Sequence, residues 1–332
     1  MPYASPSTLR APSARGPLSQ WVLARLAGAD DPGAAPVPRS SAGLDADLQL
    51  ALYLCYESHY SDIPGAVGDC EWDAALVAFR RALESRFEVA LAYLSESVAG
   101  SGAGVRAEIL AMIECDDGPS LSRYMERHGT IDEMRQFVIH RSPYQLKEAD
   151  PHTFAIPRLR GRAKQLLVRI QTGEYGAEED DHVMHSELFA QTMRALGLDD
   201  RRHAYLDVLP ASALMVSNVI SLFGLNRRWR GALVGHLAMF EATSVEPMGR
   251  YARALERMGA SPEARRFYEV HVLADAAHER MGLDMAEALA SDEPALEDSI
   301  LFGARSAVAA ERMFAGDLLA QWHPRFRSAV AA

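Results

Sequence analysis

Apolar residues recur three and four positions apart through most of the chain from Leu44 onward, which is the spacing of helices that bury one face. The alternation of apolar and polar residues that a half-buried strand needs is absent, and β-branched runs are scarce. The pattern therefore predicts an all-α protein. Its clearest helix is expected over residues 72–99, where one apolar stripe contains Leu76, Phe79, Leu83, Phe87, Leu91 and Leu94.

Glycine and proline divide the pattern into segments. Further helices are expected over 45–60, near 105–114, and up to about 149 with an interruption at Pro143. A second run of helices fills 151–325, with breaks expected at 173–176, 197–200, Gly224, Pro247 and 291–294.

The positions of glycine and proline also predict the domain organisation. Residues 1–44 are rich in proline and glycine and cannot bury enough apolar surface to offset the entropy of ordering, so we expect a flexible tail. We expect a smaller N-terminal helical region over 45–125 and a larger helical domain over 126–325. The exposed part of the N-terminal apolar stripe is expected to form the interface of a homodimer.

Composition narrows the class of protein. The 332 residues include 34 Lys and Arg against 45 Asp and Glu, a formal net charge of −11, which is opposite to the basic footprint of nucleic-acid-binding proteins. There is no run of about 18 uncharged apolar residues to span a bilayer. The three cysteines have no C-x-x-C spacing, so neither a disulfide framework nor a thiolate zinc site is indicated. We expect a cytoplasmic protein that binds neither nucleic acid nor membrane.

The segment FYEVHVLADAAHERM carries the most informative polar residues. His271, Asp275 and His278 are spaced by four and three, so on a helix they lie within an arc of roughly 60°. Phe267 and Met285 extend the same stripe as apolar residues, which indicates an inward-facing side. The alternatives are a metal site and a helix with fortuitous His and Asp. A metal site needs ligands from further helices.

Glu241 is one candidate partner. It shares a helical face with Val234, Leu237 and Ala238, where a carboxylate needs a partner. The alternative to metal binding is an ion pair with one of the nearby arginines, Arg227, Arg228 or Arg230.

Two further candidates flank an acidic run. His185 begins an apolar stripe with Leu188 and Phe189, and Glu174 continues the stripe of the preceding helix beside flexible glycines. Glu179 and His182 form an E-x-x-H pair of the kind used in ferritin-like di-iron bundles, but the second such pair is missing. We therefore prefer His185 and keep Glu179 with His182 as a rival pair.

Several motifs of other enzyme classes are absent. The sequence has no H-E-x-x-H, no G-x-S-x-G nucleophile elbow, no P-loop and no strand-linked G-x-G-x-x-G. Hydrolase, NTPase and dinucleotide-binding functions are therefore not indicated. Glu148 precedes the helix start Asp150–Pro151, and periodicity leaves its direction undecided.

Together these segments resemble the haem-oxygenase-like di-iron oxidase and oxygenase superfamily, specifically the iron-containing redox enzymes. The resemblance rests on EYG at 174–176, MHSELF at 184–189, SLFGLNRRWRGALVGHLAMFEATS at 221–244, HVLADAAH at 271–278, YQLKEADPH at 144–152, and YESHY at 56–60 with EWD at 71–73. It runs from about residue 45 to 320. It implies a seven-helix core that holds two irons, with metal ligands Glu148, His185, Glu241, His271, Asp275 and His278, and with Glu174 as an additional carboxylate seen in some members.

The resemblance also implies chemistry. Mixed imidazole and carboxylate ligation suits Fe(II), and open coordination positions let O2 bind between two irons and be reduced to a peroxo species. An external electron donor, a reductase or a chemical reductant, is implied, along with a small-molecule substrate. We expect N-oxygenation of an amine, guanidine or amino-heterocycle in a specialised biosynthetic pathway. The alternatives are C–C cleavage, decarboxylation or desaturation of an amino or fatty acid at the same site, a ferroxidase, and a metal-free helical binding protein.

Overall fold

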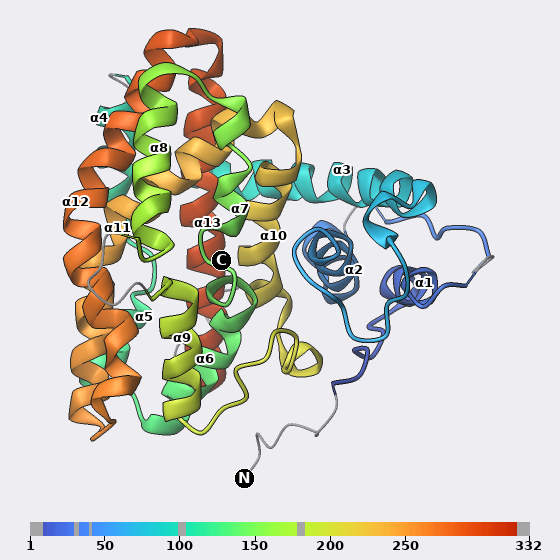
Figure 1. Cartoon of the computed structure of the whole chain (residues 1–332), viewed down its shortest axis with the longest axis horizontal. Helices are drawn as coiled ribbons and strands as arrows, with labels where there is room; N and C mark the ends of the chain where they lie inside the picture. Colours follow the sequence, from blue (N-terminus) through green and yellow to red (C-terminus); the bar gives the residue numbers. More distant parts are fainter. Residues whose placement is uncertain (1–8, 30–32, 40–41, 99–103, 178–182, 324–332) are drawn as a thin grey trace.

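The structure is a computed structural model that describes residues 9–29, 33–39, 42–98, 104–177 and 183–323, except for the side chains of residues 42, 275 and 276. Across these ranges the regular secondary structure is α-helix with short 3-10 turns, and no strand occurs in them (Figure 1). The predicted all-α fold is confirmed. None of the helices in these ranges is long and apolar enough to cross a membrane.

Loops and short 3-10 turns join the α-helices of the described ranges. Their bounds are α1 (Pro17–Leu26), α2 (Ala46–Glu57), α3 (Ala74–Glu96), α4 (Val105–Glu114), α5 (Leu121–Arg127), α6 (Ile131–Gln145), α7 (Asp150–Thr153), α8 (Gly161–Glu174), α9 (His185–Ala195), α10 (Ala211–Leu225), α11 (Arg230–Arg257), α12 (Pro262–Asp292) and α13 (Glu297–Trp322).

The core of the molecule is built on the three longest C-terminal helices. Helix α11 packs against both α12 and α13, while α8 and α9 lie on α12 and α5 lies on α11. Helix α10 contacts α13 and α2, and thereby joins the bundle to the N-terminal helices α1–α3, which project to one side in Figure 1. The ends of several bundle helices meet beside α12, and the candidate metal centre lies there.

Glycines allow α11 and α13 to approach closely. A Cβ atom built on Gly235 would lie 1.8 Å from the carbonyl oxygen of Ile300, and one built on Gly303 would lie 1.9 Å from that of Ala232. The two backbones therefore meet where any side chain would clash. This contact fixes α11, and hence Glu241, relative to α13.

The break predicted at Pro247 is wrong, because α11 continues through this residue to Arg257. A proline inside a helix removes one hydrogen bond and crowds the preceding turn. Helix α11, however, packs along both α12 and α13, and such packing supplies most of the stability of a helix in a protein. Packing between helices here outweighs the local preference.

The flexible tail predicted for residues 1–44 is wrong over residues 17–26. These residues form α1, which buries Leu18, Trp21 and Val22 against α2. The Asp47 carboxylate caps α1 by accepting hydrogen bonds from the backbone N–H groups of Leu18 at 2.9 Å and Ser19 at 2.7 Å. A carboxylate of α2 thus satisfies donors at the start of a helix that lies far away in sequence.

The long N-terminal helix agrees with its prediction. Helix α3 buries the stripe formed by Leu76, Phe79, Leu83, Phe87 and Leu91, with Leu94 partly buried. The division of the chain near residue 125 and the homodimer remain predictions.

Candidate metal centre

Glu148 lies in the turn between α6 and α7. Its neighbour Ala149 has φ 71° and ψ −41°, and the Asp150 N–H donates a 2.9 Å hydrogen bond to the Glu148 carbonyl. This is a γ-turn with positive φ, a rare and strained conformation for a residue with a side chain. The Glu148 side chain is 8% exposed and contacts the Nε2 atom of His271 at 3.5 Å.

Glu174 and His185 stand at two helix ends that face each other. Glu174 is the last residue of α8 and His185 is the first of α9, and the structure places Glu174 Oε2 2.9 Å from His185 Nδ1. His185 is fully buried. Helix α8 ends at Glu174, and the glycines near this residue allow the chain to turn there.

Helix α12 supplies two histidines from one face. His271 Nδ1 donates a 2.7 Å hydrogen bond to the Phe267 carbonyl, which leaves Nε2 as the atom that faces Glu148. About two turns further along the same face, His278 Nδ1 lies 3.3 Å from Glu174 Oε1 and 3.6 Å from Glu241 Oε2. The inward orientation predicted for this face holds for both histidines.

Glu241 is buried on α11 and points toward His278. Two of the arginines considered as its ion-pair partners point elsewhere, because Arg228 pairs with Glu88 and Arg230 pairs with Glu293.

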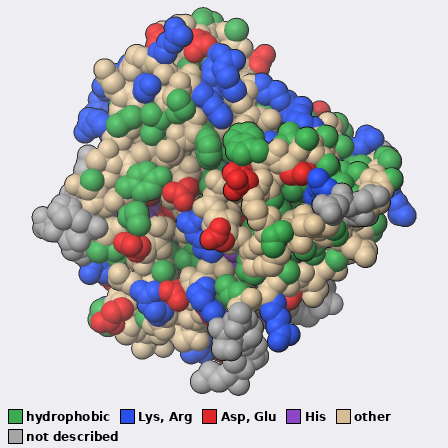
Figure 2. Space-filling model, turned by 45° about the vertical axis from the view of Figure 1, so that its right-hand side comes forward, with side chains coloured by type: hydrophobic (Ala, Val, Ile, Leu, Met, Phe, Trp, Pro, Cys, Tyr) green, Lys and Arg blue, Asp and Glu red, His purple; other side chains and the backbone are tan. Residues whose placement is uncertain are grey.

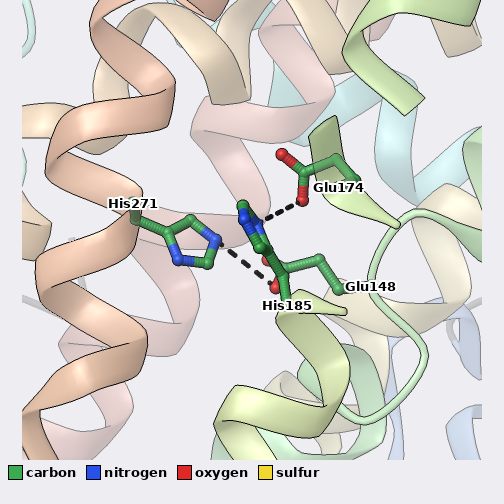
Figure 3. A group of neighbouring side chains, drawn as sticks. All are labelled: Glu148, Glu174, His185 and His271. Carbon is green, nitrogen blue, oxygen red and sulfur yellow. Dashed lines mark ion pairs between the residues drawn. The ribbon is translucent and has the colours of Figure 1, made fainter. Parts of the chain in front are cut away.

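These side chains make two groups that could each hold a metal ion. The first contains Glu148, Glu174, His185 and His271, and the second contains Glu174, Glu241 and His278. Within each group the ligand atoms lie within 4.8 Å of one another. Figure 3 shows the first group, with dashed lines from His185 to Glu174 and from His271 to Glu148. Glu174 belongs to both groups, so one carboxylate could bridge two ions.

Burial and neighbouring charge act differently on two of the carboxylates. Burial raises the pKa of Glu148 above its ordinary value, and His271 opposes this effect. Burial also acts to raise the pKa of Glu174, but His185 and then His278 outweigh it, so this pKa lies well below the ordinary value. Glu174 is therefore charged, as a bridging ligand must be.

The donor set fits iron. Carboxylates and imidazoles together suit Fe(II), and buried carboxylates need positive charge close to them. Six of the seven predicted residues come together here. The side chain of Asp275 lies outside the described residues, as do Glu179 and His182.

A cavity of about 270 Å³ opens onto both groups. Its wall includes the paired side chains Arg141 and Glu311, in which Arg141 Nη1 donates a hydrogen bond to Glu311 Oε1 at 2.6 Å. The guanidinium of Arg141 also lies over the ring of Phe314, 4.2 Å from the centroid. Other wall residues are Tyr144, His152, Phe189, Leu237, Phe240, Phe267, Tyr268, Ala307 and Val308.

Two residues that matter for this geometry lack a sequence signal of their own. Gln171 donates a 2.8 Å hydrogen bond from Nε2 to the Ala149 carbonyl and so holds the Glu148 turn. At Gly173 a Cβ atom would lie 2.8 Å from His278 Nε2, so only glycine leaves room for that imidazole. For Gly173, the sequence shows only that a glycine lies within a helical stripe, a position where glycine usually has a packing reason.

Comparison with known proteins agrees with this chemistry. A family model described as "iron-containing redox enzyme" matches residues 135–312, more than half of the chain. This chain belongs to that family. The matched range contains every residue of both metal-ligand groups. The description of the family names iron, which agrees with the imidazole and carboxylate donors of the two groups.

A curated relative and a solved structure are also similar to this chain. Nitrosourea synthase of Streptomyces achromogenes subsp. streptozoticus is 26% identical over 147 residues, which are 44% of this chain and 31% of the relative. The chain thus spans less than a third of that protein. A CADD-like protein of unknown function from Nostoc punctiforme aligns with TM-score 0.49 and 14% identity over 70% of this chain and 96% of that chain.

Charge on the surface is mixed. On the face in Figure 2, acidic and basic side chains are interspersed with apolar ones and do not gather into one basic patch.

Proposed function

We propose that this protein binds two irons in the two adjoining groups and uses O2 to oxidise a small organic molecule, most specifically by N-oxygenation of an amine, guanidine or amino-heterocycle. The observation that carries the proposal is the shared carboxylate Glu174 between two buried groups at the floor of a cavity. The likeness to nitrosourea synthase supports chemistry at nitrogen.

The ligands divide between the two positions. Glu148, His185 and His271 would hold one iron, Glu241 and His278 would hold the other, and Glu174 would bridge them. Asp275 is a further ligand candidate on α12. When bound, ferrous iron supplies electrons and open coordination positions for O2.

The surrounding residues prepare the site. The hydrogen bond from His271 to the Phe267 carbonyl keeps Nε2 directed at the metal position. Phe240, Phe267 and Tyr268 give the cavity aromatic walls beside the candidate metal positions. The lining thus favours a substrate that presents apolar surface along with a few polar groups.

The size and polarity of the cavity set the substrate class. A volume of about 270 Å³ lies just below the usual range of ligand pockets, which is about 300–1,000 Å³, and so favours a small substrate. The Arg141–Glu311 pair offers both charge signs to a polar substrate, and a plain fatty acid would use only one of them. We infer an amino-acid-like or amino-heterocycle substrate.

Iron binding and O2 use are tested together. Anaerobic Fe(II) titration of the wild type should end at two irons per chain, and stopped-flow mixing with O2 should give a transient visible band. His271→Ala should bind less iron and lose the band. The matched control His140→Gln alters another buried histidine, outside both groups, and should keep both properties.

Product analysis separates the remaining functions. Amines and guanidines incubated with the reduced protein and isotopically labelled O2 should yield products with labelled oxygen on nitrogen. Iron oxidation without an organic product would indicate a ferroxidase. Products changed at carbon would indicate C–C cleavage, decarboxylation or desaturation in place of N-oxygenation. A folded wild type that binds no iron would contradict the proposal itself.

A further inference from the structure

A buried ion pair lies directly beside the Glu148 turn. The Lys147 ammonium contacts Glu57 Oε1, and the two side chains are 2% and 1% exposed. Glu57 is the last residue of α2, whereas Lys147 immediately precedes the candidate ligand Glu148. Two helical regions that are 90 residues apart are thus joined by opposite charges at this point.

The pair sits in its own polar pocket, separate from the metal-ligand groups. Lys147 Nζ lies 4.2 Å from the centroid of the Tyr60 ring and 5.4 Å from that of Tyr53. On the other side, Glu57 Oε2 lies 4.0 Å from His203 Nε2. Burying two charges is costly, and the cost is offset only when geometry and neighbours are good. Removal of one partner leaves a buried charge without compensation, whereas replacement of both partners by apolar residues is often neutral for stability.

The strained turn that follows Lys147 is stabilised by contacts from neighbouring elements. Ala149 has positive φ, and such strained backbone persists only where the surrounding structure over-determines it. On the α8 side, Gln171 binds the Ala149 carbonyl, and the Tyr175 hydroxyl donates to Asp150 Oδ1 at 3.0 Å. On the opposite side, the ion pair of Lys147 with Glu57 ties the start of the turn to α2. The next side chain, that of Glu148, points toward His271 in the first metal-ligand group.

We propose that Glu57, acting through Lys147, is a positioning residue that fixes the carboxylate of Glu148 for metal binding; this inference rests on the proposed function. Glu57 lies outside residues 135–312, the part that matches the family model. The N-terminal helix α2 therefore contributes to the geometry of the metal centre through one ion pair. Residues that orient ligands in this way typically change metal affinity by about 10- to 100-fold.

Cobalt titration tests the proposal without relying on enzyme activity. Co(II) bound to carboxylate and imidazole ligands absorbs visible light, and the band reports how many ligands the ion has. Glu57→Gln should weaken Co(II) binding at the position that uses Glu148 by about tenfold or more and change its band. The position formed by Glu241 and His278 should keep its affinity.

A matched control separates positioning from general loss of stability. Glu84 on α3 is also fully buried, and it pairs with Arg80 at 3.6 Å and accepts hydrogen bonds from Tyr56 at 3.3 Å and Asn226 at 2.9 Å. None of these three partners belongs to the Glu148 turn. Glu84→Gln should lower the melting temperature and leave both cobalt bands unchanged. Unaltered cobalt binding in Glu57→Gln, at a comparable melting temperature, would overturn the inference.

A second variant covers the case in which Glu57→Gln fails to fold. The double variant Glu57→Leu with Lys147→Met removes both charges, and apolar replacement of a buried pair is often neutral for stability. It should fold, and its affinity for Co(II) at the Glu148 position should again be lower than that of the wild type. A double variant with the cobalt affinity of the wild type would overturn the inference. A wild type that binds no cobalt and no iron would instead contradict the proposed function.

Discussion

At Gly173, the missing side chain leaves the space that the imidazole of His278 occupies. The glycine is one residue before Glu174, which would bridge the two irons. A Cβ atom at this position would meet the Nε2 and Cε1 atoms of His278 at 2.8 and 2.9 Å. One position thus controls a carboxylate and an imidazole together.

Gly173→Ala should therefore damage metal binding without weakening the helix. Gly173 is the penultimate residue of α8, where the preference for alanine over glycine is at most the interior value of about 1 kcal/mol, so the helix itself is not weakened. The imidazole of His278 must move, and we expect loss of the iron held by Glu241 and His278. Iron titration and thermal unfolding measure the two effects separately.

Gly249→Ala is the matched control, because a Cβ atom there meets only the flexible end of Arg253 at 3.1 Å and Val272 at 3.7 Å. It should keep the full iron content. Equal iron binding by both variants would show that His278 is not held by this contact.

Glu148 shows at the same scale what the sequence leaves undecided. Periodicity orients residues inside helices, and it correctly placed His185, Glu241, His271 and His278 inward. Glu148 lies in a turn with a strained neighbour, where no period applies. Only the resemblance to a family suggested it. The geometry of such a turn depends on Gln171 and Lys147, whose contacts are distant in sequence.

At the scale of elements, the crossing of α11 and α13 depends on glycines. Gly235→Ala places a Cβ atom 1.8 Å from a backbone carbonyl oxygen, and backbone cannot rotate away as a side chain can. We expect a loss of about 3 kcal/mol or more in the free energy of unfolding, at the upper end of overpacking effects. Denaturant unfolding of the metal-free protein measures it.

Gly231→Ala, one turn earlier on α11, is the comparison. A Cβ atom there lies 3.0 Å from the Cβ and Oγ atoms of Ser299 and 3.3 Å from the carbonyl oxygen of Leu296, contacts that a shift of a few tenths of an ångström would relieve. We expect its effect to stay below about 1 kcal/mol. Similar losses in the two variants would mean that the close backbone contact does not set the stability of this helix pair.

Two elements show why local patterns did not suffice. Helix α1 follows proline and glycine in sequence, yet it docks on α2, where Asp47 caps it, and Arg25 pairs with Asp73 at the start of α3 at 2.6 Å. Pro247 is a helix breaker by local rules, yet α11 continues because of its neighbours. Both outcomes depend on tertiary contacts, which periodicity does not contain. The long stripe of α3, by contrast, is a property of the sequence alone.

At the scale of the whole molecule, the cavity connects the metal centre to helices far from the ligands. Val308 on α13 is 8% exposed and lines this cavity, although it belongs to neither ligand group. Val308→Phe would place a ring in a space of about 270 Å³. If the substrate binds there, the ring competes with it directly.

We therefore expect Val308→Phe to keep the iron content and the reaction of reduced iron with O2, while formation of the oxidised amine falls by at least tenfold. The fall corresponds to about 1.4 kcal/mol of lost binding or transition-state stabilisation. Val168→Phe adds the same ring on α8, where the side chain is 40% exposed and does not line the cavity, and should match the wild type. Undiminished product formation by Val308→Phe would place the substrate outside this cavity, because a ring of that size would leave a bound substrate too little room.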